Sequence, residues 1–273
     1  MRLFIIPSWF PTKDYPVSGI MIKEQTEAFC RAYPAVKVGM SVFGNTEHKY
    51  LLLAKDHVKN IKKVLFADTR PYTNKLLPNL TTYHKPAFSW TRRFRNGNIK
   101  AIVEANIYNL KAFEADAGPV DVIHAHVGYP AGIIAMEIAR KLKIPYCLTE
   151  RMGPFPSIYT RDKNNQLLAY YKQPYQESAL NIAVSPFQVQ AMRRQGINNI
   201  TMIPNFLDEH KFRPAEHSKR QNHLFTFFSL SFISPQKGTD QLVYAIKEVT
   251  KTQQQVRFRI GGDGSHLPAF KTL

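Results

Sequence analysis

The feature that most constrains the fold is a regular alternation of short apolar segments with stretches of helical periodicity. Between residues 1 and 203 the apolar segments that read as strands are 3–6, 36–43, 120–126, 144–149, 181–184 and 200–203. Apolar residues at helical spacing lie between them at 20–29, 99–115 and 131–142. Strands that alternate with helices are typical of βαβ units, so we expect an α/β fold with a mostly parallel sheet.

The start of one helix is specified by its local sequence. Ser185 precedes Pro186, and Gln188 follows three residues after Ser185. A serine cap, a proline at the first helical position and a glutamine at the third form a capping box, which predicts a helix beginning here. We expect that helix to end at Gly196, because glycine is favoured just beyond a helix C-terminus.

The chain changes character after residue 203. A turn sequence begins at Pro204, and the segment that follows, up to residue 222, is polar and charged. We therefore expect a first domain over residues 1–203, a linker over 204–222 and a second domain over 223–273.

The second domain is expected to be small. Its sequence predicts strands at 224–231 and 256–260, joined by a helix at 240–250. Two neighbouring strands with a single crossover helix cannot cover both faces of a parallel sheet, so we expect this domain to be incomplete.

Basic residues dominate the charge balance. The sequence has 37 Lys and Arg against 20 Asp and Glu, a formal net charge of +17. Such a surface attracts nucleic acid, acidic lipid headgroups or phosphorylated small molecules. With 44% hydrophobic and 21% charged residues, the composition excludes a disordered chain, a collagen-like repeat and a disulfide scaffold.

Cysteine usage and the N-terminus indicate the compartment. Cys30 and Cys147 are far apart in apolar surroundings, so we expect buried, reduced thiols. No apolar run approaches the roughly 18 residues of a membrane span. Pro7 interrupts the apolar N-terminal segment before it could form a secretion signal, so we expect a soluble, cytoplasmic protein.

Candidate functional residues follow the predicted strands. Gly19 opens a helix after the first strand, where free backbone N–H groups could approach a phosphate, although a glycine here could also simply permit a tight turn. His124 and His126 share one face of the third strand; we expect His124 to be packed and His126 to be functional. Glu150 ends the next strand and could act beside His126 as an acid or base or as a carboxylate that binds the acceptor. It could equally form a salt bridge to Arg151 or be a surface charge. No further ligands stand in register for a metal site.

The second domain repeats this arrangement. Lys237 precedes Gly238 at a predicted helix entrance, where a lysine can bind a phosphate as a point charge. Gly262 and Gly264 follow a strand and would allow a ligand to approach the backbone closely.

Taken in order, these segments resemble the family 4 glycosyltransferases, which have the GT-B fold. The resemblance rests on Pro7-Ser8-Trp9-Phe10-Pro11, Gly19, Glu24-Gln25, Asp121-Val122-Ile123-His124-Ala125-His126, Thr149-Glu150, Val184-Ser185, Ile203-Pro204-Asn205, Asp208, Phe212, Pro214, Lys237-Gly238, Leu242 and Gly262-Asp263-Gly264. It implies a complete N-terminal Rossmann-like domain followed by part of a second Rossmann-like domain.

The resemblance also implies an activity. Such enzymes are hexosyltransferase-type proteins that move a sugar from a nucleotide-sugar, here a UDP- or GDP-sugar, to an acceptor hydroxyl with retention at the anomeric carbon. They use no bound metal or cofactor. The acceptor would be lipid-linked or a saccharide of the cell envelope or an exopolysaccharide. Gly19 would donate a backbone N–H to the donor diphosphate, His126 would lie beside the transferring sugar, and Lys237 would neutralise the leaving diphosphate.

Two departures from the family pattern matter. Phe232 stands where the family usually has an arginine that completes the diphosphate clamp. The family's E-x7-E segment and its nucleotide contacts would lie beyond residue 273. We therefore expect these 273 residues, tested alone, to lack transferase activity.

Two basic clusters stand beside apolar residues, and either could equally be a solvated surface. One comprises Lys55, Lys59, Lys62 and Lys63; the other comprises Arg92, Arg93 and Arg95. Such clusters are typical of contacts with anionic lipid, so we expect peripheral binding to the inner membrane face.

Two other classes remain open on the sequence alone. The charge also suits a non-catalytic anion-binding or partner-subunit protein, although no nucleic acid is expected because RNP-like and zinc-finger sequences are lacking. The same fold could also carry an epimerase or a phosphorylase.

Overall fold

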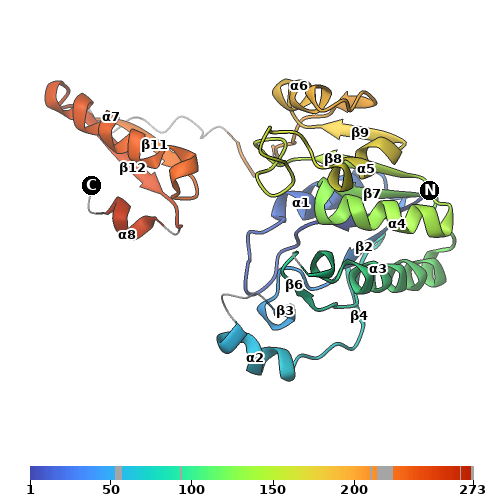
Figure 1. The fold of residues 1–273 in the computed structure, drawn as a ribbon. Helices are drawn as coiled ribbons and strands as arrows, with labels where there is room; N and C mark the ends of the chain where they lie inside the picture. The colour runs from blue at the N-terminus through green and yellow to red at the C-terminus, as the bar shows by residue number, and fades with distance from the viewer. Residues whose placement is uncertain (53–56, 93, 210, 214–223, 265, 272–273) are drawn as a thin grey trace. The chain divides into compact units, whose positions relative to one another are not determined.

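The structure, a computed structural model, describes residues 1–52, 57–92, 94–209, 211–213, 224–264 and 266–271. The chain divides into two compact units, Met1–Phe206 and Leu207–Leu273 (Figure 1).

A single sheet organises the first unit. Its strand order is β10-β9-β8-β7-β1-β2-β5-β4, and every neighbouring pair is parallel except β4 and β5. The strands are β1 (Arg2–Pro7), β2 (Lys37–Val42), β4 (Tyr72–Leu77), β5 (Leu80–His84), β7 (Val122–His126), β8 (Tyr146–Glu150), β9 (Leu180–Ala183) and β10 (Ile200–Met202). The α/β class and the parallel sheet predicted from the alternation are confirmed.

The apolar pattern does not predict β4 and β5. Both strands are rich in polar residues, and β5 reads Leu-Thr-Thr-Tyr-His. Within the sheet, Thr82 and Tyr83 are nevertheless buried, and the Asn79 side chain at the hairpin turn donates hydrogen bonds of 3.0 Å to the carbonyls of Cys30 and Val36. Hydrogen bonds made across the fold therefore stabilise a strand that its own hydrophobicity does not specify.

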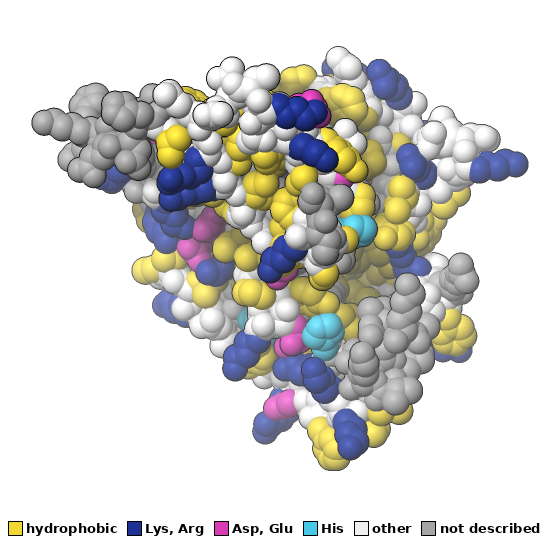
Figure 2. Space-filling view, turned by 90° about the vertical axis from the view of Figure 1, so that its left-hand side faces the viewer, with side chains coloured by type: hydrophobic (Ala, Val, Ile, Leu, Met, Phe, Trp, Pro, Cys, Tyr) yellow, Lys and Arg dark blue, Asp and Glu magenta, His cyan; other side chains and the backbone are white. Residues whose placement is uncertain are grey.

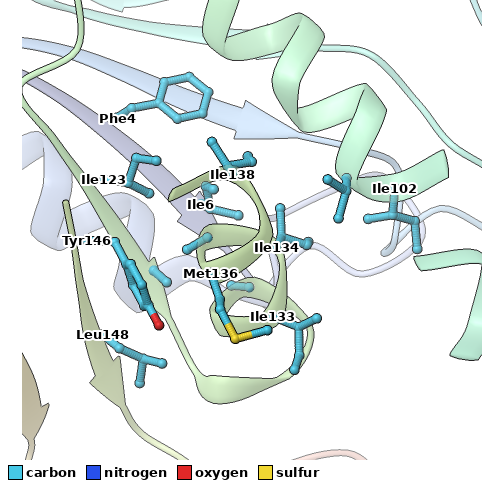
Figure 3. Packing of buried hydrophobic residues seen from close by; sticks show 14 of the residues in the cluster. Phe4, Ile6, Ile102, Ile123, Ile133, Ile134, Met136, Ile138, Tyr146 and Leu148 are labelled. Carbon is cyan, nitrogen blue, oxygen red and sulfur yellow. The ribbon is translucent and has the colours of Figure 1, made fainter. Parts of the chain in front are cut away.

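Helices cover both faces of this sheet, as parallel strands require. The helices are α1 (Ile20–Ala32), α2 (His57–Leu65), α3 (Arg95–Ala117), α4 (Ile133–Leu142), α5 (Ala169–Glu177) and α6 (Pro186–Arg194). Phe4 and Ile6 of β1 pack into a cluster with residues of α3 and α4 (Figure 3). Leu3 and Ile5 point to the opposite face, where Cys30 of α1 is buried. The alternation along β1 thus divides the core into two layers.

Short elements complete the first unit. They are η1 (His48–Tyr50), η2 (Gly128–Gly132) and the two-stranded sheet of β3 (Leu51–Leu52) and β6 (Ser89–Trp90). The beginning of α3 is irregular, because Asn96, Gly97 and Asn98 have positive φ values, so regular helix starts at the predicted residue 99.

The predicted capping box is confirmed at α6. The Ser185 hydroxyl accepts a hydrogen bond of 3.2 Å from the backbone N–H of Gln188. The Gln188 side chain accepts one of 2.9 Å from the N–H of Val184, one residue earlier than the usual partner. Gly196 follows the helix with a φ of +72°, in the left-handed region that ends helices.

The second unit contains one βαβ arrangement. Strands β11 (Phe225–Leu230) and β12 (Val256–Gly261) are parallel and flank α7 (Thr239–Thr252), with the short η3 (Pro235–Lys237) and α8 (Leu267–Phe270) beside them. The predicted strands and helix are confirmed. Large apolar side chains of β11 are exposed: Phe225, Phe227, Phe228 and Leu230.

Candidate active site

The carboxyl ends of β1, β2, β7 and β8 meet at one edge of the first sheet, where doubly wound folds bind their ligands. A cavity of about 340 Å³ lies among the loops at this edge. We call it the strand-end cavity. Its aromatic wall comprises Trp9, Phe43, Trp90, Tyr129, Phe155, Tyr159 and Tyr175.

Hydrogen bonds from distant segments hold the loop after β1. The Ser8 hydroxyl accepts from the N–H of Ala131 at 3.1 Å, and the Ser8 N–H donates to the carbonyl of His126 at 3.2 Å. The Thr46 hydroxyl donates to the carbonyl of Phe10 at 2.8 Å. This loop is therefore a fixed wall of the strand-end cavity.

Gly19 packs directly against that loop. It has a φ of +71°, and a Cβ at this position would lie 2.1 Å from the carbonyl oxygen of Trp9. This close approach accounts for the glycine without any ligand, in line with the tight-turn interpretation. A contact between Gly19 and a donor diphosphate stays a prediction.

The two histidines of β7 lie side by side, with ring centroids 4.2 Å apart. His124 Nε2 is 2.7 Å from the Thr149 hydroxyl, so the prediction that His124 is packed and hydrogen-bonded is confirmed. His126 is 2% exposed, and its Nδ1 accepts a hydrogen bond of 3.4 Å from Arg151 Nε. Burial, together with the charges of His124 and Arg151, keeps the pKa of His126 well below its usual value, so its imidazole is neutral.

Glu150 is 2% exposed and holds the ends of two loops together. One carboxylate oxygen accepts from the backbone N–H groups of Arg151 at 2.9 Å and Met152 at 2.7 Å. The other accepts from the N–H of Gly128 at 3.0 Å and from the Tyr175 hydroxyl. Burial raises the pKa of the Glu150 carboxyl, and these hydrogen bonds act against that rise.

These contacts correct the simpler alternatives for Glu150. It is not a surface charge, and its carboxylate meets the backbone N–H of Arg151 rather than the guanidinium. All four hydrogen bonds join protein groups, which assigns Glu150 a positioning task. Its role as an acid or base stays a prediction.

Arg151 is the functional candidate that sequence reasoning missed. Its guanidinium donates to the side-chain oxygens of Gln25 and Asn205 and faces His126. Gln25 and Asn205 belong to two of the resemblance motifs, yet they lie far from Arg151 in the sequence. The only signal was their shared presence in those motifs, because spacing alone cannot show that three loops converge.

In the second unit, Lys237 is exposed at the end of η3. Gly238, with a φ of +65°, is the N-cap residue just before α7. Phe232 is 61% exposed. Lys237 therefore stands at a helix N-terminus as predicted from the sequence, with an exposed ring rather than a cation at position 232.

Gly262 and Gly264 approach a neighbouring loop of their own unit. A Cβ would lie 2.0 Å from the carbonyl oxygen of Ser231 at Gly262, and 2.3 Å from that of Ile233 at Gly264. The close approach that these glycines allow is thus to the backbone of residues 231–233. Binding of a ligand by Gly262 and Gly264 stays a prediction.

The predicted basic clusters divide in the structure. Lys62 and Lys63 are exposed on α2, whereas Lys55 and Arg93 lie outside the described residues, as does the side chain of Lys59. Arg92 lines the strand-end cavity, and Arg95 lies over the ring of Phe94 outside that cavity. Binding of either cluster to a membrane surface stays a prediction.

Metal ligands and membrane-spanning helices are both lacking among the described residues. No group of three or more His, Cys, Asp or Glu side chains there could hold a metal ion. No helix in the described part of the chain is both long and apolar enough to cross a bilayer.

Solved structures identify the class of fold. Sucrose-phosphate synthase from Thermosynechococcus elongatus superimposes with a TM-score of 0.65 at 16% identity, over 96% of this chain and 62% of that one. The catalytic domain of starch synthase IV from Arabidopsis thaliana gives 0.60 at 12% identity, over 100% of this chain and 70% of that one. Both likenesses show the fold, and the chain has the GT-B fold of glycosyltransferases.

Sequence comparison then gives the family. The model of Glycosyltransferase Family 4 matches residues 66–211, more than half of the chain, so the protein belongs to glycosyltransferase family 4. A phosphatidylinositol N-acetylglucosaminyltransferase component from Arabidopsis thaliana is 37% identical over 73 residues, which cover 26% of this chain and 16% of that protein. The chain thus spans less than two thirds of the sucrose-phosphate synthase, and the matched segment covers only a small part of the Arabidopsis transferase component.

Proposed function

We propose that the first unit carries the acceptor-side half of a retaining hexosyltransferase that uses a nucleotide-sugar donor. The observation that carries the proposal is the strand-end cavity, whose wall includes Trp9 and Glu150 of the family 4 motifs and Val127, the residue that follows His126. Support for the donor class comes from the Escherichia coli trehalose-6-phosphate structure with bound UDP-2-fluoro glucose, which has a TM-score of 0.55 over all of this chain and 67% of that one, at 12% identity.

His126 is the proposed catalytic residue. Because Arg151 Nε donates toward Nδ1, the neutral imidazole carries its proton on Nε2. Such a group can donate a hydrogen bond to a sugar oxygen without adding charge. Arg151 positions the ring, and Glu150 fixes the loops that begin at Val127 and Arg151.

Lys237 is the proposed partner of the donor diphosphate. Its side chain is exposed, and the N-terminus of α7 follows it in the chain. A positive charge therefore lies next to the free backbone N–H groups of a helix, and both can bind a phosphate. Glycosyl transfer from a nucleoside diphosphate develops negative charge on the departing phosphate, and preorganised donors stabilise that charge. Phe232 adds no cation, so we propose that Lys237 provides most of this stabilisation.

A binding measurement tests the donor assignment without requiring turnover. UDP and GDP should bind more tightly than UMP and GMP, and Lys237→Gln should weaken diphosphate binding by about tenfold. Lys251→Gln is a matched control, because Lys251 lies on α7 and pairs with Glu248. Equal binding of mono- and diphosphates that Lys237→Gln leaves unchanged would refute the assignment.

We further propose that the 273 residues tested alone bind the diphosphate of these ligands but do not complete transfer. The exposed apolar side chains of β11 support this proposal, because parallel sheets are normally covered by other elements on both faces and this one is not within the described residues. The test is release of nucleotide from a panel of UDP- and GDP-sugars with lipid-linked and saccharide acceptors. Clear turnover would refute the proposed inactivity, and NMR of an inverted product would refute retention.

The proposed acceptor is a cell-envelope or exopolysaccharide intermediate, met at the cytoplasmic face of a membrane. The segment Ile61–Phe66 supports membrane contact, because Ile61, Leu65 and Phe66 are 51%, 73% and 88% exposed beside Lys62 and Lys63. Exposed apolar side chains lie among Lys and Arg on the face drawn in Figure 2. Such a segment suits an anionic bilayer surface.

Liposome sedimentation tests the membrane contact. Binding should be stronger to vesicles containing phosphatidylglycerol than to phosphatidylcholine vesicles, and Leu65→Ser with Phe66→Ser should remove most of it. Lys111→Ser is the control, since Lys111 pairs with Glu114 on α3. Equal binding to neutral and anionic vesicles would contradict the electrostatic part of the proposal.

A further inference from the structure

Arg92 occupies an unusual position in the wall of the strand-end cavity. Its guanidinium carbon lies 4.9 Å from the ring centroid of Tyr129 and 5.0 Å from that of Tyr159. One of its nitrogens donates to the Tyr159 carbonyl at 3.4 Å. Two aromatic rings therefore hold a flexible cation in place, which lowers the entropic cost of using it to bind a ligand.

The charge of Arg92 is not neutralised within the described residues. No carboxylate there forms an ion pair with it. Glu150 is the acidic residue of the cavity wall, and each of its oxygens already accepts two hydrogen bonds. A guanidinium has five N–H donors, so Arg92 retains donors for an anion.

The rest of the wall defines what accompanies that anion. Trp9, Trp90 and Phe155 present aromatic surface, while Ser8, Asn45 and Ser157 add small polar groups. Aromatic surface packs against the C–H faces of a sugar or cyclitol ring, and hydroxyl and amide groups bind its hydroxyls. The cavity volume of about 340 Å³ falls within the range of small-molecule sites.

We propose that Arg92 is a specificity-determining residue that binds a phosphate ester next to the saccharide or cyclitol ring of the acceptor. This deepens the proposed function and rests on its assignment of the strand-end cavity to the acceptor. The phosphate could belong to a soluble sugar phosphate or to a lipid headgroup, and both present the same oxygens to a guanidinium.

The tryptophans make the site directly observable. The chain contains two, Trp9 and Trp90, and both line the strand-end cavity, so intrinsic fluorescence reports ligand there. The probes are α-D-glucose 1-phosphate, neutral methyl α-D-glucopyranoside, and a short-chain phosphatidylinositol kept below its micellar concentration. Titrations use the full chain, Arg92→Gln, Arg92→Lys and the control Arg95→Gln.

At least one phosphate ester should bind about tenfold more tightly than the neutral glucoside, and Arg92→Gln should abolish that difference. Binding of the glucoside should not change in Arg92→Gln, because that probe has no anion. Arg92→Lys should restore part of the affinity, since lysine keeps the charge but not the planar fork. Arg95→Gln should behave like wild type, because Arg95 lies outside the cavity.

The preferred phosphate ester identifies the source: glucose 1-phosphate indicates a soluble acceptor, and phosphatidylinositol indicates a lipid headgroup. The proposal is overturned if Arg92→Gln keeps the difference, if Arg95→Gln loses it equally, or if neither phosphate ester binds more tightly than the glucoside. These titrations contain no donor, so a failure of UDP or GDP to bind would refute the donor assignment and leave this result interpretable.

Discussion

Replacing Glu150 with glutamine tests whether this buried carboxylate stabilises the fold at the carboxyl edge of the first sheet. Its best amide orientation keeps the oxygen where it accepts from Arg151 and Met152. The amide nitrogen then faces the N–H of Gly128, which loses its acceptor, while the Tyr175 hydroxyl can reverse and accept. One buried donor is left unpaired, and two hydrogen bonds lose their charged acceptor.

These losses set the magnitude. An unpaired buried donor costs about 1–3 kcal/mol, and losing the charge from two hydrogen bonds costs about 1 kcal/mol more. Removing a buried charge returns part of this, because burial already raises the pKa of Glu150. We expect Glu150→Gln to lower the free energy of unfolding by about 2–3 kcal/mol.

Urea unfolding followed by tryptophan fluorescence measures this change in the first unit, since both tryptophans belong to it. Glu104→Gln is the matched control. Glu104 pairs with Lys141 at 2.6 Å with both side chains more than half exposed, so its loss should cost under about 1 kcal/mol. A Glu150→Gln protein within about 0.5 kcal/mol of wild type would refute the positioning role and favour a direct part in catalysis.

Three further changes follow from individual contacts. Gly19→Ala should destabilise the first unit by about 2–4 kcal/mol in urea unfolding, because its Cβ meets the Trp9 carbonyl and φ is positive; wild-type stability would show that the loop yields easily. Ser185→Ala should cost about 1 kcal/mol by the same measurement, through loss of the cap on α6, whereas Ser157→Ala tests a hydroxyl outside any helix. Burial lowers the pKa of His84 and of His124 to about 4 from 6.5, so their neutral forms contribute stability that is present above pH 6.5 and is lost as pH falls toward 4. The free energy of unfolding should therefore decrease as the pH is lowered from 6.5 toward 4, and this decrease should be smaller in His84→Asn. A free energy of unfolding that does not change with pH would contradict the burial of these histidines.

The fold was largely accessible from the sequence because its determinants are local. The apolar segments along β1, β2, β7 and β8 and the Ser185 cap each carry a signal within a few residues. The hairpin of β4 and β5 has no local signal of comparable strength. It is stabilised instead by distant groups, since the Asn79 side chain donates hydrogen bonds to the carbonyls of Cys30 and Val36. Strands of this kind cannot be predicted from their own sequence, because the contacts that stabilise them come from other segments of the fold.

The candidate site divides along the same line. Residue types and strand positions were enough to select His126, Glu150 and Lys237 and to indicate the family. They could not show that the Glu150 carboxylate accepts hydrogen bonds from backbone N–H groups, or that Gly262 packs closely against the carbonyl of Ser231. Those facts depend on loops that follow different strands.

The sequence by itself therefore determined the class of fold and the family, and it selected candidate residues at the strand ends, because hydrophobic periodicity and short motifs are encoded locally. Only the tertiary structure decided the tasks of the charged residues. It turned Arg151 toward His126 and held Arg92 between Tyr129 and Tyr159 in the cavity wall. The physical reason is that the effect of a charge depends on its neighbours and its burial, and both are set by segments distant in the chain.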